Sequence, residues 1–99
     1  MFEIVEIDQK IMVTPEKNIV AEIVSEFRES MKKYASDEKE IVVDLKNVEM
    51  IDSMGLGALI ATHNSMQKYE KKLEIENISK DLLALMKTMC LDQHFVINI

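Results

Sequence analysis

The sequence predicts an α/β fold in which a mostly parallel, mixed sheet is built from strands joined by crossover helices. Short segments with strand-like patterns alternate along the chain with longer segments whose apolar residues recur every three or four positions. One short segment, residues 41–45, is apolar almost throughout, as expected for the buried central strand of a parallel sheet. The expected order is strand, strand, helix, strand, helix, strand, helix, strand.

The first elements are a hairpin of two strands and a long amphipathic helix. Residues 2–7 and 11–13 have strand-like patterns. Pro15 then breaks the pattern because it has no N–H to donate to a strand ladder, and either Thr14 or Asn18 is suited to cap the next helix. That helix is predicted from one apolar stripe, made of Ile19, Val20, Ile23, Val24, Phe27, Met31 and Tyr34.

The C-terminal half is predicted to contain two helices and two further strands. A helix begins near Asp52 and continues to about Tyr69, and residues 73–76 then alternate as a strand. Ser79 is suited to cap the last helix, and residues 95–99 form the final strand. The apolar face of the last helix is expected to comprise Leu82, Leu83, Leu85, Met86 and Met89.

Length and composition indicate one domain that covers residues 1–99. With 47% apolar and 30% charged residues, the chain can bury a core and keep a charged exterior. No apolar run approaches the roughly 20 residues that cross a bilayer. Acids near the N-terminus do not suit a signal peptide, and the single cysteine, Cys90, allows no internal disulfide. We therefore expect a cytoplasmic protein without direct membrane contact.

The charge of the chain argues against nucleic-acid partners. Twelve basic and eighteen acidic residues give a net charge of −6, which repels phosphate backbones. The lysine pairs at 32–33 and 71–72 have acids nearby and no interleaved aromatic side chains. We therefore expect no binding to DNA or RNA.

The most unusual stretch of the sequence is residues 51–57. It holds both glycines of the chain within a segment that otherwise favours helix, where a glycine costs roughly 1 kcal/mol relative to alanine. We expect the bare backbone to allow close approach by a neighbouring strand, a phosphate or a partner protein. Asp52 is expected to cap the helix, with Ile51 and Leu56 as a hydrophobic staple. Ser53 would then hold its hydroxyl group at the start of the helix.

Residues 41–45, the loop after them and residues 50–57 resemble the signature of STAS domains of the anti-sigma factor antagonist family. The similarity extends from about residue 41 to Met89, and the expected element order matches over the whole length. It implies a STAS-like domain that binds proteins, is not an enzyme and needs no cofactor. It also implies that a partner kinase phosphorylates Ser53. The partner-binding residues implied by the resemblance are Asp52, Ser53, Met54, Gly55, Leu56 and Gly57.

Members of this family act as switches in bacterial transcription. Without phosphate they bind an anti-sigma factor, often itself the ATP-dependent serine kinase, and so release a sigma factor; a phosphatase resets them. The resemblance implies the same partners here. A phosphate on Ser53 would add about −1.5 to −2 charges at a helix N-terminus, which favours anions. A docked partner would have to bury that charge beside Asp52 and Asp44, at a high cost without a cation.

Two features depart from the family pattern. Residues 14–18 replace the usual Gly-Glu-Leu-Asp-like run, and Met54 stands where Ser or Thr is common. The Met54 side chain either supplies adaptable contact area to a partner or packs against the domain itself.

Two alternative functions stay open. The first is a STAS adaptor in a sensor-kinase, chemotaxis or transporter complex, without phosphorylation of Ser53. The second is a small nucleotide-binding module, although the chain lacks a Rossmann glycine pattern and a P-loop lysine.

The remaining reactive side chains have structural interpretations. His63 lies on the apolar stripe of its helix and is expected to be a hydrogen-bonded packing residue. It follows Ser53 by ten residues, about 15 Å along a helix, which is too far for a catalytic base. Cys90 and His94 lack a second ligand pair for zinc, so we expect Cys90 to be a packed thiol and expect no bound metal.

Overall fold

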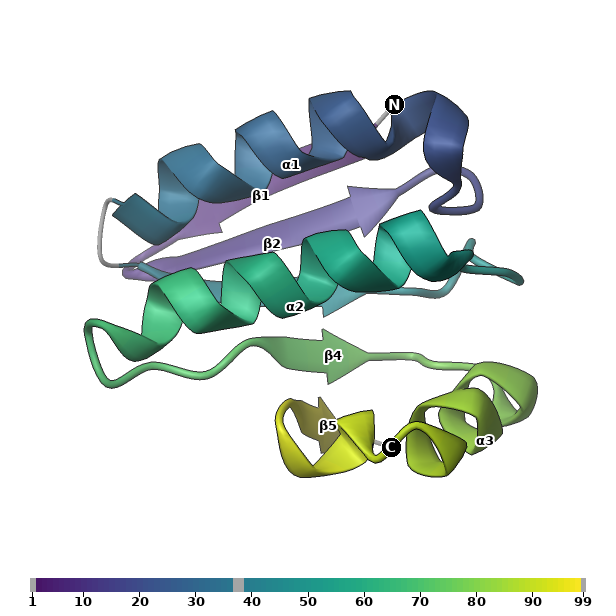
Figure 1. Ribbon diagram of the computed structural model, residues 1–99. Helices are drawn as coiled ribbons and strands as arrows, with labels where there is room; N and C mark the ends of the chain where they lie inside the picture. The colour runs from purple at the N-terminus through teal and green to yellow at the C-terminus, as the bar shows by residue number, and fades with distance from the viewer. Residues whose placement is uncertain (1, 37–38, 99) are drawn as a thin grey trace.

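The computed structural model describes residues 2–36 and 39–98, and it confirms the expected α/β order of strands and helices (Figure 1). One element was not expected, a short 3-10 helix after the last α-helix. The elements are β1 (Phe2–Ile7), β2 (Lys10–Pro15), α1 (Ala21–Ser36), β3 (Glu40–Asp44), α2 (Ser53–Gln67), β4 (Glu74–Glu76), α3 (Lys80–Thr88), the 3-10 helix η1 (Leu91–Gln93) and β5 (Val96–Asn98).

The strands form one sheet in the order β1-β2-β3-β4-β5. β1 pairs with β2 in antiparallel fashion, and every later pair is parallel. β3 lies at the centre, and its residues Ile41, Val42 and Val43 are at most 1% exposed. The prediction of a buried central strand from its continuous apolar run is therefore confirmed.

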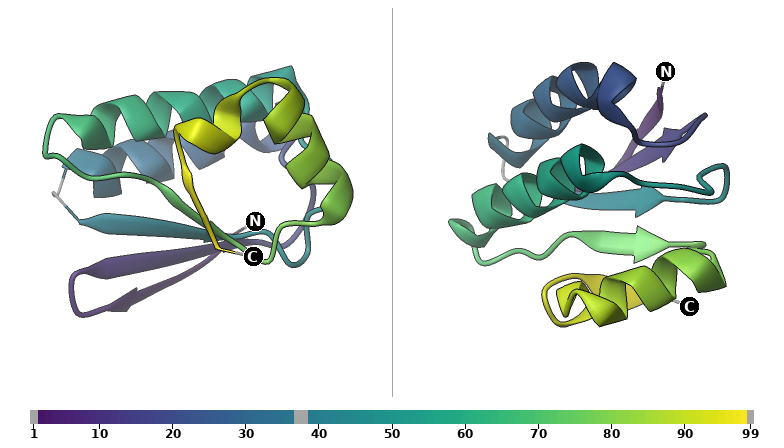
Figure 2. Two further views of the ribbon diagram at one scale, coloured as in Figure 1. Left: turned by 90° about the horizontal axis from the view of Figure 1, so that it is seen from below. Right: turned by 45° about the vertical axis from the view of Figure 1, so that its right-hand side comes forward.

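Helices α1 and α2 lie side by side over one face of the sheet, and no helix covers the opposite face in either view of Figure 2. The core fills the space between the helices and the sheet. Its largest fully buried side chains are Phe27, Ile11, Ile19, Met31, Ile41, Leu45, Leu59, Met66, Leu73, Ile75, Met86 and Val13. This two-layer packing holds the loops before α1 and α2 at the same edge of the sheet.

The start of α1 differs from the sequence prediction. The helix begins at Ala21, so Ile19 lies before it and forms an isolated parallel bridge with Ile51. Ile19 is buried because of that bridge rather than because of a helical stripe. Neither Thr14 nor Asn18 caps the helix, so that prediction was wrong; the group that does cap it is described below.

The last helix also packs differently from the prediction. Ser79 caps α3 as expected, since its Oγ accepts a hydrogen bond from the N–H of Leu82 (3.2 Å). Leu82 and Met86 are buried, but Leu85 and Met89 are 37% and 48% exposed, so the predicted apolar face is only half correct. Because α3 has only nine residues, it contacts the core through one row of side chains, and Leu82 and Met86, four residues apart, form that row.

The segment after α3 turns through Cys90, which has a left-handed backbone (φ 60°). Cys90 is exposed, so the prediction of a packed thiol was wrong. The chain then forms η1, buries Phe95 and enters β5. The predicted end of the last strand, Ile99, lies outside the described residues.

Candidate functional site

The loops before α1 and α2 follow the carboxyl ends of β2 and β3, which are parallel neighbours. Asn18 connects the two loops, because its Oδ1 accepts hydrogen bonds from the N–H groups of Glu49 (2.8 Å) and Met50 (3.0 Å). The N–H of Asp52 donates to the carbonyl oxygen of Ile19 (3.3 Å). The sequence does not reveal this role of Asn18, because its partners lie more than thirty residues further along the chain. The loops are therefore held as one unit.

Asp52 caps two helices with one carboxylate. Its Oδ1 accepts a hydrogen bond from the N–H of Gly55 (2.8 Å), which confirms the predicted cap of α2. Its Oδ2 accepts from the N–H of Ala21 (3.0 Å), the first residue of α1. This second contact explains how α1 begins without a capping side chain of its own. The carboxylate thereby fixes the two helix N-termini relative to each other.

The two glycines of α2 have different surroundings. A Cβ atom on Gly55 would lie 2.3 Å from the backbone oxygen of Ile19 and 2.8 Å from Cγ2 of Ile51. The close approach expected at Gly55 is therefore made by the chain's own backbone. Gly57 is exposed, and a Cβ atom there would have no neighbour within 4 Å. The internal packing of the described residues thus requires a glycine at position 55 but not at position 57.

Six residues were predicted to form a partner-binding site, and they divide into a surface group and a buried group. Ser53, Met54 and Gly57 are exposed, and Asp52 is half-buried; the other two, Gly55 and Leu56, are buried. Leu56 belongs to the hydrophobic core together with Ile51, as expected for a hydrophobic staple. A partner can therefore contact the surface group directly, but not the two buried residues.

Two exposed methionines lie close to Ser53 in the sequence. Met50 and Met54 are both 55% exposed, although methionine is usually buried. Methionine is flexible and polarizable, so it adapts to differently shaped surfaces. The pair provides apolar contact area on both sides of the serine along the chain.

Acidic side chains surround the neighbouring hollow. Its volume is about 410 Å³, and Glu16, Glu22 and Glu49 line it together with Lys17. Asp44 is not part of that surface: it is 7% exposed, and its Oδ1 accepts hydrogen bonds from the backbone of Lys46 and the amide of Asn77, both 3.0 Å. The exposed charge near the start of α2 is therefore mainly negative.

His63 packs in the core, but not in the expected way. It is 2% exposed, and within residues 2–36 and 39–98 neither ring nitrogen has a hydrogen-bond partner, so the prediction of a hydrogen-bonded histidine was wrong. Its ring makes edge-to-face contacts with His94 (6.1 Å between centroids) and Phe95 (5.4 Å). Burial lowers the pKa of His63, and the charges of His94 and Lys72 lower it further.

We expect the stability of the protein to fall as the pH drops below about 6.5, the ordinary pKa of histidine in an unfolded chain. Because the folded pKa of His63 is lowered, the unfolded chain binds the extra proton between the two pKa values. Between the two pKa values, His63 alone can lower the free energy of unfolding by about 1.4 kcal/mol per pH unit. Above the unfolded pKa this loss of stability is absent.

Urea unfolding of the wild type and of His63→Leu, measured between about pH 7 and about pH 5.5, tests this expectation. The variant should lose part of the pH dependence, since it has no titrating group at this position. If the free energy of unfolding of the two proteins depends on pH in the same way, His63 does not cause the loss of stability.

The described part of the chain offers no group of three or more His, Cys, Asp or Glu side chains that could hold a metal ion. Nor does any helix within it have the length and apolar character needed to cross a membrane.

The family model of the STAS domain matches residues 1–99. This chain belongs to the STAS domain family. The resemblance seen in residues 41–57 is thereby confirmed, and the five-stranded mixed sheet with its helices matches the STAS fold.

Solved structures similar to this STAS domain include anti-sigma factor antagonists. A Thermotoga maritima protein assigned as an anti-sigma factor antagonist superposes with a TM-score of 0.89 and 20% identity, over 97% of this chain and 84% of that one. The antagonist SpoIIAA in its unphosphorylated form gives a TM-score of 0.82 at 10% identity, over 100% and 88% of the two chains. The phosphorylated form of SpoIIAA from Bacillus gives 0.79 at 11% identity, over 100% and 92%. At these identities the likeness shows the shared fold.

Proposed function

We propose that this STAS domain is an anti-sigma factor antagonist that binds its anti-sigma factor when Ser53 carries no phosphate and releases it when Ser53 is phosphorylated. One observation carries the proposal. Ser53 is exposed in the first turn of α2. A serine at the start of a helix often serves as its cap, but here Asp52 caps α2. Within residues 2–36 and 39–98 no hydrogen bond of the Ser53 hydroxyl group is found, which supports its availability to an enzyme.

The chemistry of the proposed switch is a transfer of phosphate to and from one oxygen. The partner kinase transfers the γ-phosphoryl group of ATP to Ser53 Oγ, with release of ADP and of the hydroxyl proton. A phosphatase hydrolyses the phosphoserine and returns the hydroxyl group. Both steps belong to the partners, so this chain acts as a substrate and binding protein in the bacterial cytoplasm rather than as an enzyme.

Phosphorylation is expected to affect binding more than folding. A phosphate on Ser53 would meet the free N–H groups and the positive dipole end of α2, which stabilise an anion. A docked partner, by contrast, would have to bury about two negative charges near Asp52, Glu22 and Glu49. Relatives of the same fold support this view, since SpoIIAA is known in an unphosphorylated and a phosphorylated form.

We therefore expect Ser53→Asp to weaken binding to the anti-sigma factor at least about tenfold, while the thermal midpoint stays within a few degrees of wild type. Ser53→Ala should bind as the wild type does, because it adds no charge. Calorimetric titration with the anti-sigma factors and kinase-like ATPases of the source organism measures the affinities. Thr88→Asp, a change of an exposed hydroxyl residue on α3, is the matched control.

Mass spectrometry of protein isolated from its native cells tests the modification itself. A phosphate on Ser53 in at least one growth state is the expected result. If Ser53 is never phosphorylated and no anti-sigma factor binds, the proposed function is wrong.

A further inference from the structure

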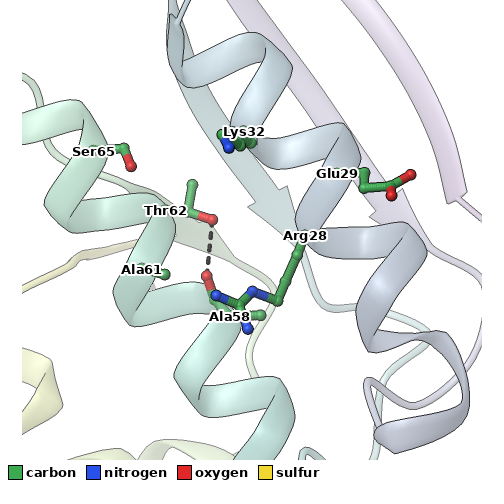
Figure 3. A pocket seen from close by; sticks show the side chains of 7 residues that line it. All are labelled: Arg28, Glu29, Lys32, Ala58, Ala61, Thr62 and Ser65. Carbon is green, nitrogen blue, oxygen red and sulfur yellow. Dashed lines mark hydrogen bonds between the residues drawn. The ribbon is translucent and has the colours of Figure 1, made fainter.

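An open groove runs between α1 and α2 on the outer surface of the helical layer (Figure 3). Its volume is about 380 Å³. The α2 side consists of small residues, with Ala58, Ala61 and Thr62 at the base and Ser65 further along. The hydroxyl group of Thr62 donates to the carbonyl oxygen of Ala58 (2.8 Å), so it is already used within α2. The α2 side of the groove is therefore mostly apolar.

The α1 side of the groove carries Arg28, the only arginine of the chain. Figure 3 shows its guanidinium group reaching across toward Ala58, whereas the carboxylate of the neighbouring Glu29 points away from α2. Among the described residues Arg28 has no ion-pair partner. A planar guanidinium group binds a carboxylate through two parallel hydrogen bonds, which a lysine cannot do. Arg28 therefore offers a carboxylate site at the edge of an apolar groove.

Beyond the groove, the helix face that carries Ala61 and Ser65 continues toward Ser53. Met54, Gly57, Ala61 and Ser65 follow one another at spacings of three and four residues, so they share a helix face. Gly57 has open space where a side chain would be, and the packing of the described residues gives no reason for a glycine there. A missing side chain allows another backbone to approach closely, which compensates for the stability that a glycine costs within a helix.

The groove lies within reach of a partner that contacts Ser53. Ser65 follows Ser53 by twelve residues, which is about 18 Å along a helix. A stable interface buries about 800 Å² on each partner, a patch roughly 30 Å across. A patch of that size covers both Ser53 and the groove when its centre lies between them.

We infer that this groove seats an acidic helix of the anti-sigma factor, with a carboxylate paired to Arg28 and the helix packed over Gly57 and Ala61. The inference rests on the proposed function, which supplies the partner. Charge supports the acidic helix, since the guanidinium group lies here while Glu16 and Glu49 line the hollow beside the loops. Because the two regions carry charges of opposite sign, a partner with complementary charges docks in one orientation.

Charge reversal at Arg28 tests the ion pair. Arg28→Glu is expected to weaken binding to the anti-sigma factor at least about tenfold, as for charged residues at interface centres, and Arg28→Lys should weaken it less. Lys33→Glu makes the same change of charge on α1, where the ammonium group lies over the ring of Tyr34 outside the groove, and should cost no more than about twofold to threefold. Changing the paired acid of the anti-sigma factor to arginine should restore binding to Arg28→Glu.

A steric test keeps the inference independent of charge. Ala61→Leu fills the groove and should weaken binding, whereas Gln67→Leu, at an exposed position on a different face of α2 outside the groove, should not. Thermal unfolding of each variant verifies that it folds. If the wild type binds and both Arg28→Glu and Ala61→Leu bind equally well, this inference is wrong and the proposed function stands. If the wild type binds no anti-sigma factor, both are wrong.

Discussion

Replacing Gly55 with alanine is expected to lower the free energy of unfolding by about 3 kcal/mol, at the upper end of the cost of overpacking a core. The added Cβ atom would lie 2.3 Å from the carbonyl oxygen of Ile19, and a backbone atom cannot move aside as a flexible side chain can. The loop before α1 would have to shift, which would disturb the bridge between Ile19 and Ile51. For a chain of this length the thermal midpoint should fall by roughly 12 to 24 °C.

The matched control is Gly57→Ala, the same exchange two residues further along α2. It should raise the free energy of unfolding by roughly 0.5 to 1 kcal/mol, because alanine favours the helix and its Cβ atom meets open space. Chemical denaturation of both variants gives the two values. Equal effects at the two positions would contradict the close contact at Gly55, and so would two stabilised variants.

The sequence predicted the sheet well because the relevant signals are contiguous. Residues 41–45 are apolar except for Asp44, and a nearly continuous apolar run is typical of a buried central strand. The alternation at Glu74–Glu76 likewise corresponds to β4, in which only Ile75 is buried. In both cases a few neighbouring residues contain the whole pattern.

The start of α1 was predicted less well because its cause lies elsewhere in the chain. Ile19 extends the apolar stripe at helical spacing, yet it is buried by its bridge to Ile51. The capping group of the helix, Asp52, follows Ala21 by thirty-one residues. Periodicity within a segment does not distinguish an apolar residue of a helix from one that pairs with a distant loop.

The sequence marked the start of α2 as unusual and predicted its cap, Asp52, but it did not distinguish the roles of the two glycines. Two glycines beside Asp52 and Ser53 correctly marked an unusual helix start. Only the structure separates Gly55, which admits the chain's own backbone, from Gly57, which lies open. Likewise, nothing in the residues near Arg28 predicts a groove, because the groove requires a second helix beside it. Contacts between distant segments create these differences, so they have no local pattern.

Asp52→Ala is expected to lower the free energy of unfolding by about 1 to 4 kcal/mol, since it removes the caps of two helices and each cap contributes about 0.5 to 2 kcal/mol. The N–H groups of Ala21 and Gly55 lose their carboxylate acceptor together. Asp52→Asn should cost less, because its amide oxygen can still accept one of the two hydrogen bonds. Ser79→Ala, which removes the single cap of α3, is the control and should cost about 1 kcal/mol.

Amide hydrogen exchange distinguishes a double cap from a single one. In Asp52→Ala the amides of Ala21 and Gly55 should both exchange faster, although they belong to different helices. Faster exchange at Gly55 alone would mean that α1 does not depend on Asp52. If both respond, the carboxylate that frees Ser53 from capping also fixes α1 beside α2. The same contact then determines the width of the groove between α1 and α2, so Asp52→Ala should also weaken binding of a partner that uses that groove.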